Sequence, residues 1–211
     1  KGYFLIKKLN KFSETKLELM YAAEILFGQK GIKNTSHRDI INITNQKNIS
    51  AISYHFQDLQ GLVRALLEFR MSIVDADREE RYKKIIKENI ISNNNLMDAY
   101  IDPLYERCIS DKEWANYIYF LKHLITDYDI QFINYLQTYS KVTLLIENEL
   151  KKINNIHDDG LWNTKLLNVG AFLTASLAFR KRELDNNNKV PDDKKYLNYL
   201  KKSVLNIFLF K

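Results

Sequence analysis

Apolar positions recur at the spacing of one face of an α-helix, about 3.6 residues, along most of the chain. The first such run covers residues 15–30, and Gly31 follows it as a stop signal. Two short helices are expected next, one beginning at Thr35 or Ser36 and one over residues 50–56. Residues 57–58 then cap a longer run that continues to about residue 77. The pattern predicts three helices in quick succession, followed by one long helix.

Beyond this run the pattern stays helical and is divided by polar or glycine-containing breaks. The breaks fall at residues 92–95, 110–111, 127–129, 154–160 and 185–193. Two of the resulting helices are long, 130–153 and 161–184, and the second carries the small residues Gly170, Ala171 and Ala175. Such a pair can form a four-helix dimer seam with a second copy of the chain. Burial of both helices inside one monomer explains the same periodicity.

Turn-forming residues are scarce, since the 211 residues include only 6 Gly and 2 Pro. Sandwiches and barrels need many tight turns, so this composition favours an all-α fold. The one cysteine, Cys108, cannot form an internal disulfide, and no run of about 18 apolar residues or secretory segment occurs. We therefore expect a cytoplasmic protein without a membrane partner.

Positive charge is concentrated near the N-terminus. Residues 1–57 contain nine lysine and arginine residues against four acids, whereas the remainder contains 23 basic and 22 acidic residues. A basic head on a nearly neutral body indicates a polyanionic partner for the head. A solubilising N-terminal tail is the alternative explanation of this charge.

The segment 35–56 has a helix, a polar turn and a second short helix, the arrangement in which the second helix can enter the major groove of DNA. Ile52 and Phe56, four residues apart, are expected to face inward. The outward positions carry side chains that can reach phosphates or base edges, or that allow close approach to DNA. They are Thr35, Ser36, Arg38, Asn48, Ser50, Ala51, Ser53, Tyr54 and His55. A small polar helical hairpin without a nucleic-acid partner has a similar composition.

These residues also carry a resemblance to a known family. The motif runs from Ala22 to Phe27 and Gly31, through Thr35, Ser36, Arg38 and Ile40, to Asn48, Ser50, Ala51, Tyr54, His55, Phe56 and Leu62. It resembles the DNA-binding domain of the tetracycline-repressor family over roughly the first third of the chain. The turn 45–49 is longer than the family's usual turn and lacks its glycine. Leu59 and Gln60 stand where the family often has a phosphate-binding lysine, so Lys47, Arg64 or helix amides would have to replace it.

The resemblance implies an N-terminal helix-turn-helix DNA-binding domain, residues 1–57, and a larger helical effector-binding and dimerisation domain, residues 58–211. It implies a homodimeric repressor that binds a palindromic DNA operator through the residues above and Lys47, and that a small molecule releases. The helices 130–153 and 161–184 are then the expected dimer interface.

The resemblance also implies an effector pocket behind the DNA-binding domain. Aromatic side chains and one histidine supply wall material for a small, largely apolar effector, although a helical core needs aromatic residues in any case. The candidates are Tyr82, Tyr100, Tyr105, Trp114, Tyr117, Phe120, His123 and Tyr128. Three arginines, Arg70, Arg78 and Arg81, could reach an anionic ligand, but a solvated helix face is the simpler explanation and the one we expect.

No enzyme class finds support in the sequence. Cys108 and His123 lack a third orienting residue and a glycine-rich oxyanion loop. The acidic cluster after His157 lacks a second histidine or cysteine at metal-ligand spacing, and no phosphate-cradling glycine loop occurs. We expect no cofactor and no metal. The competing class is a helical protein-interaction module whose basic head binds an acidic protein or membrane surface without reading DNA sequence.

Overall fold

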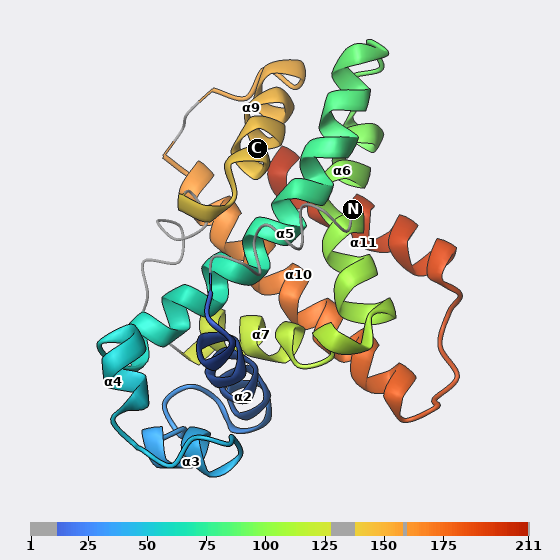
Figure 1. Cartoon of the computed structure of the whole chain (residues 1–211). Helices are drawn as coiled ribbons and strands as arrows, with labels where there is room; N and C mark the ends of the chain where they lie inside the picture. The colour runs from blue at the N-terminus through green and yellow to red at the C-terminus, as the bar shows by residue number, and fades with distance from the viewer. Residues whose placement is uncertain (1–11, 128–137, 158–159, 211) are drawn as a thin grey trace.

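The computed structural model describes residues 12–127, 138–157 and 160–210, and this part of the chain is all-α with no strand (Figure 1). The helices are α2 Glu14–Lys30, α3 His37–Asn42, α4 Ala51–Phe56, α5 Leu59–Lys87, α6 Asn93–Tyr105, η1 Glu106–Ser110, η2 Lys112–Trp114, α7 Tyr117–Asp127, α9 Lys141–Ile153, α10 Trp162–Asp185 and α11 Asp193–Leu209. Of these helices, none is long and apolar enough to cross a membrane.

Local capping signals set the predicted helix ends. Gly31 ends α2 with φ 84°, a conformation that favours glycine. Ser36 begins α3 in a reciprocal capping box with Asp39. The Asp58 carboxylate accepts from the Gly61 amide at 2.6 Å and begins α5. The three predicted helices near the N-terminus and the start of the long one are therefore confirmed.

Two predicted boundaries were wrong. The long helix continues to Lys87 rather than ending near residue 77, because residues 78–87 are mostly strong helix formers and because Arg78 and Ile85 are buried. The helix expected over 130–153 does not continue through Ser140, whose φ of −127° and ψ of 60° are not helical. Asp75 accepts from the Val142 amide at 3.1 Å, which favours a helix start at this point.

Residues 128–137 lie outside the described residues, and with them Tyr128, most of the predicted break at 127–129 and the first part of the predicted helix 130–153. The last two helices agree with the sequence pattern, since α10 covers 162–185 and α11 begins at Asp193 after the predicted break.

The buried core is continuous from the N-terminal helices into the rest of the molecule. Helix α2 packs on α7, as Figure 1 also shows. Phe27 stacks on Phe120 with ring centroids 5.8 Å apart. A Cβ atom on Gly28 would lie 3.0 Å from the Asn116 carbonyl oxygen, so a side chain there would force the two helices apart. The first helix is thus held by α7 as well as by α5.

A buried ion pair joins the first helix to the long one. The Arg70 guanidinium on α5 donates to both oxygens of Glu24 on α2, at 2.7 and 2.9 Å, and only 2% and 3% of these two side chains is exposed. Arg70 also donates to the Glu113 carbonyl in η2 at 2.8 Å and lies 4.3 Å from the centroid of the Trp114 ring. The expectation of a solvated face was therefore wrong for Arg70. It was also wrong for Arg78, which is buried and donates to the Tyr100 carbonyl at 3.0 Å.

Removing one partner of this pair should be costly. We expect Arg70→Met to lower the free energy of unfolding by about 3–5 kcal/mol, because it leaves the Glu24 carboxylate buried without a partner. Equilibrium urea unfolding measures the effect. The double variant Glu24→Gln/Arg70→Met removes both charges and should recover part of the loss. A single variant as stable as the unmodified protein would contradict the assigned role of the pair.

A second buried polar group lies between α5, α6 and α9. Arg78 donates to the Thr143 hydroxyl at 3.0 Å, and the Tyr100 hydroxyl donates to Glu147 at 3.2 Å. Burial raises the pKa of Glu147 to about 7, against the smaller opposing effects of the Tyr100 hydrogen bond and Arg78. Glu147 therefore holds its proton in the folded protein at a pH where an unfolded chain has lost it.

This difference gives the stability a defined pH dependence. Between pH 4.5 and about 7 the folded state binds more protons at Glu147 than the unfolded state, so its contribution to stability falls as pH rises through this window. We expect Glu147→Gln to raise the stability at pH 8 by roughly 1–3 kcal/mol and to flatten the slope. Urea unfolding at pH 5, 6, 7 and 8 measures both effects. An unchanged slope in the variant would show that the carboxyl titrates normally.

Candidate nucleic-acid interface

Helices α3 and α4 lie at one end of the molecule, away from α9 (Figure 1). Helix α4 is anchored by Ile52 and Phe56, both buried as the sequence predicted. Ser53 and Tyr54 on the same helix face solvent, and 85% of Tyr54 is exposed. The ring of Tyr54 stands edge-on to His55, with centroids 4.8 Å apart. The helix therefore has an apolar inner side and a polar, aromatic outer side.

Two cations flank this outer side in the chain. Arg38 on α3 and Lys47 in the turn are exposed, and neither forms an ion pair with another residue in the described part of the chain. Ser50 precedes α4 and is also exposed, whereas Ala51 and His55 are half-buried. Of the ten predicted DNA contacts, Thr35 alone is buried, and Ser36 and Asn48 are exposed as well.

The turn before α4 has a fixed geometry. The Asn48 side-chain oxygen accepts from the Ser50 amide at 2.9 Å, and its carbonyl accepts from the Ala51 amide at 3.0 Å. From α2, Glu18 accepts from the Asn45 amide at 2.6 Å and from the Gln46 side chain at 2.7 Å. Both hydrogen bonds lower the pKa of Glu18, and the bond from the Asn45 amide has the larger effect. Sequence analysis missed Glu18, because its partners are 27 and 28 residues away.

Thr35 and Ser36 have other partners than the sequence predicted. Thr35 is buried, and its hydroxyl donates to the Gly31 carbonyl at 2.8 Å, so it closes the end of α2 and is not presented to solvent. The Ser36 amide donates to the Asp39 carboxylate at 2.8 Å. Lys30, 2.9 Å from Asp39, and then Ser36 hold the pKa of that carboxyl well below its usual range. The Ser36 amide at this helix start is therefore bonded to a carboxylate of the same chain.

At the start of α5 a carboxylate also accepts a hydrogen bond from a backbone amide. Asp58 accepts from the Gly61 amide and lies 4.0 Å from Arg64. Of the replacements considered for the missing lysine, only Lys47 is without such a partner among the described residues. A Cβ atom on Gly61 would lie 1.8 Å from the Phe56 carbonyl oxygen, so the end of α4 and the start of α5 require glycine here. Sequence analysis missed this requirement because Gly61 lies inside a helical pattern.

The predicted effector-pocket residues are mostly core residues. Tyr100, Tyr105, Trp114, Tyr117 and Phe120 are buried. The Tyr117 ring lies between the other two, with its centroid 5.3 Å from that of Trp114 and 6.0 Å from that of Phe120. Tyr105 donates to Asp193 at 2.5 Å and lies beside Tyr196.

The two remaining described candidates, Tyr82 and His123, are half-buried, and His123 packs against Gly31. Tyr128 lies outside the described residues. A groove between α6 and α11 has none of these side chains in its lining. The rings fill space between helices instead, as a helical core requires.

The chemistry of the remaining candidates gives no reactive centre. Burial raises the pKa of the Cys108 thiol far above its ordinary value, which disfavours the thiolate that a nucleophile needs. Among the described residues, no group of three or more histidine, cysteine, aspartate or glutamate side chains is arranged to hold a metal ion. Asp158 and Asp159 lie outside those residues.

The chain was compared with protein-family models and with curated proteins. No protein-family model matches the chain, and a search of curated proteins gives no match either. The resemblance to tetracycline repressors therefore stays a prediction that depends on the motif between Ala22 and Leu62 and on the outward face of α4.

Proposed function

We propose that this protein is a DNA-binding transcriptional repressor of the tetracycline-repressor type and that α4 is its reading helix. The observation that carries the proposal is the outward face of α4, where Tyr54 is 85% exposed above the buried Ile52 and Phe56. Together with the exposed Ser53, it gives this anchored helix side chains of the kinds that contact phosphates and base edges. The fixed turn before α4 supports this role, because a reading helix must hold its side chains in one register.

Each exposed residue has a distinct task in this proposal. Arg38 and Lys47 neutralise backbone phosphates, which gives affinity for any duplex. Ser50, Ser53 and Tyr54 approach base edges in the major groove and supply discrimination between sequences. Asn48 shapes the start of α4 through its oxygen and keeps its amide group as a donor.

A homodimer is part of the proposal, because two reading helices are needed for a palindromic operator. Helix α10 supports it with a stripe of exposed or half-buried apolar positions four residues apart, Leu167, Ala171, Ala175 and Phe179. The exposed fractions of Leu167 and Phe179 are 44% and 57%, and the small residues between them allow close helix approach. Exposed Leu145 adds apolar surface on α9.

The DNA contacts are tested by selecting duplexes from a random pool and measuring affinity for the selected site by fluorescence anisotropy. We expect one palindromic site. Arg38→Gln and Lys47→Gln should weaken binding to selected and random duplexes alike, and each should reduce the slope of log affinity against log salt by about 0.9. Ser53→Ala and Tyr54→Ala should mainly reduce the preference for the selected site.

The matched control is Lys83→Gln, which removes one charge from an exposed position near the C-terminal end of α5. It should leave both affinities nearly unchanged. Recovery of no site, or of random duplexes only, would favour the interaction module with a basic head. Selected-site binding that survives all four changes on α3, α4 and their connecting turn would place the reading surface elsewhere.

The α10 stripe predicts the oligomeric state. We expect a dimer in sedimentation velocity at micromolar concentration and a monomer for Leu167→Glu/Phe179→Glu, because two carboxylates would be buried in the seam. The control Tyr199→Glu changes a residue of similar exposure on α11 and should stay dimeric. Circular dichroism checks that all variants remain helical. A monomeric unmodified protein would exclude the seam.

A further inference from the structure

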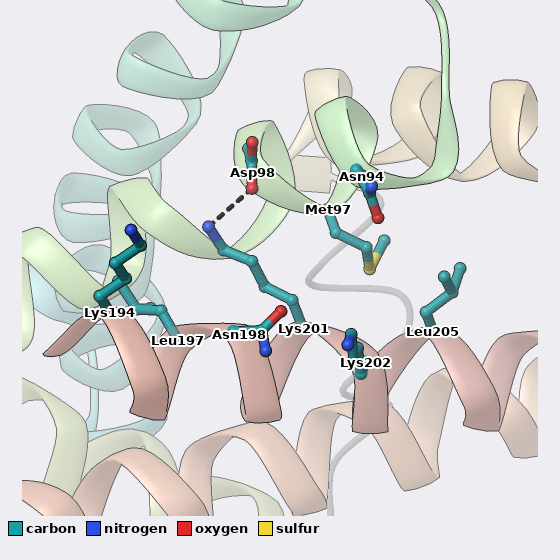
Figure 2. Close-up of a pocket in the computed structure, with 9 residues that line it drawn as sticks. All are labelled: Asn94, Met97, Asp98, Lys194, Leu197, Asn198, Lys201, Lys202 and Leu205. Carbon is teal, nitrogen blue, oxygen red and sulfur yellow. Dashed lines mark hydrogen bonds and ion pairs between the residues drawn. The ribbon is translucent and has the colours of Figure 1, made fainter. Parts of the chain in front are cut away.

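A groove of about 740 Å³ lies between α6 and α11 (Figure 2). Its apolar lining comes from Met97 on α6 and from Leu197 and Leu205 on α11. Figure 2 shows Met97 projecting from α6 toward α11, with Leu205 pointing back from the opposite side. The volume is in the range that small-molecule sites occupy, about 300–1,000 Å³.

The charged lining of this groove is mostly positive. Lys194, Lys201 and Lys202 contribute to it, against a single carboxylate, Asp98. Lys201 lies 2.7 Å from Asp98, so its charge is compensated. Lys194 and Lys202 are exposed, and neither has an ion-pair partner among the residues that the structure describes. The groove therefore combines an apolar surface with two uncompensated cations.

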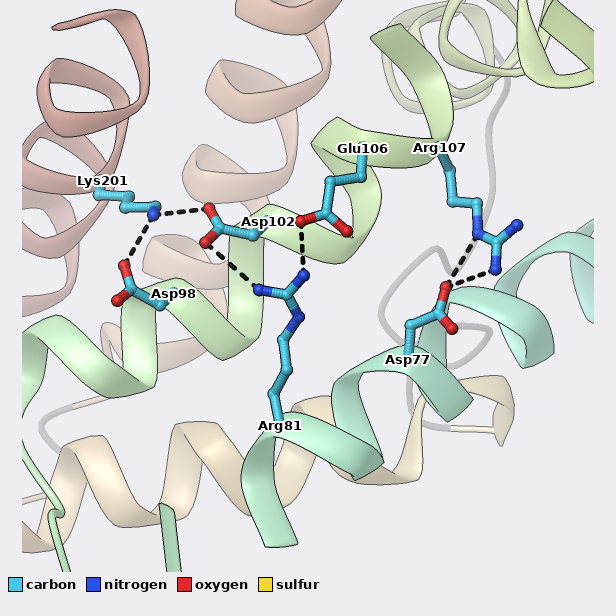
Figure 3. A network of polar contacts seen from close by, with 7 residues as sticks. All are labelled: Asp77, Arg81, Asp98, Asp102, Glu106, Arg107 and Lys201. Carbon is cyan, nitrogen blue, oxygen red and sulfur yellow. Dashed lines mark hydrogen bonds and ion pairs between the residues drawn. The ribbon is translucent and has the colours of Figure 1, made fainter. Parts of the chain in front are cut away.

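Lys201 also connects the groove to the helix that follows the reading helix (Figure 3). Its amino group lies 2.6 Å from Asp102, which in turn lies 3.5 Å from Arg81 on α5. Arg81 is bonded to Glu106 at 2.5 Å. Arg81 lies near the C-terminal end of α5, and α4 packs on the same helix, so the network extends from the groove to the helix on which α4 packs.

We propose that this groove binds a small organic anion with an apolar body, held by Lys194 and Lys202, and that the anion competes with Asp98 and Asp102 for Lys201. The apolar body packs on Met97, Leu197 and Leu205. Weakening of the Lys201–Asp102 contact frees Asp102 and changes its pairing with Arg81. The proposed anion site depends only on the groove. Its role as the effector site of a repressor rests on the proposed function.

Binding is tested with decanoate, an anion with an apolar chain, used below its micelle concentration. The chain contains three methionines, all of them largely buried, and Met97 lines the groove whereas Met20 and Met71 do not. With ¹³C-methyl methionine, decanoate should shift the Met97 signal saturably and leave the other two nearly unchanged. Met97→Leu assigns the signal. Decanol, with the same chain and no charge, should not saturate the site over the same range.

Two charge variants locate the anion. Lys194→Gln/Lys202→Gln should weaken decanoate binding at least tenfold, whereas Lys189→Gln/Lys195→Gln, which removes the same charge from exposed positions outside the groove, should change it less than twofold. Absence of a saturable Met97 shift, equal binding of decanol, or an equal loss in the control variant would each overturn the proposed site.

The effect of the anion on α5 is measured in the absence of DNA, so a negative result here is distinct from failure of the proposed function. We expect decanoate to increase amide hydrogen exchange in residues 77–87 of the unmodified protein and to change it little in Arg81→Gln. Decanoate that binds without this difference would overturn the competition for Lys201. With a selected duplex in hand, decanoate should lower DNA affinity in the unmodified protein and not in Arg81→Gln.

Discussion

The structure depends on the ion pair between Glu24 and Arg70. Both groups are almost fully buried, so each would be strongly destabilising without the other. Their planar two-bond geometry fixes α2 against α5, and the further bond to the Glu113 carbonyl adds η2 to the same point. A hydrophobic contact tolerates sliding, whereas this arrangement does not. The directional hydrogen bonds of this pair, as well as the burial of apolar surface, therefore set the relative placement of the first helix and the long helix.

The position of α4 follows from these two helices. Glu18 on α2 holds the turn that precedes α4, and Gly61 on α5 permits the close approach of its last carbonyl. Ile52 and Phe56 complete the attachment from inside. None of these four residues is a proposed DNA contact, yet together they decide where Ser53 and Tyr54 point. The accessible face of α4 is thus a product of the core beneath it.

Local features were predictable from sequence, and contacts between distant residues were not. Gly31, Ser36 and Asp58 act within four residues of the helix ends that they define, and each was assigned correctly. Arg70 and Arg78 were expected in solvent, because a charged residue in a helical pattern gives no sign of a partner tens of residues away. Thr35 was placed at the DNA surface for the same reason, since its polar side chain does not reveal that a preceding carbonyl binds it. The α6–α11 groove brings together residues about a hundred positions apart, and no periodicity indicates it.

The packing of α2 on α7 limits how residues 12–57 can be transferred to another protein. Gly28 lies against Asn116, and Phe27 against Phe120, so one side of α2 is completed by residues far beyond the head. A chimera that joins residues 12–57 to another helical body would leave this side uncovered unless the new body supplied a matching helix. A transfer of residues 12–57 therefore has to include the α7 surface that covers α2. The smallest segment that can be transferred intact is larger than the three N-terminal helices.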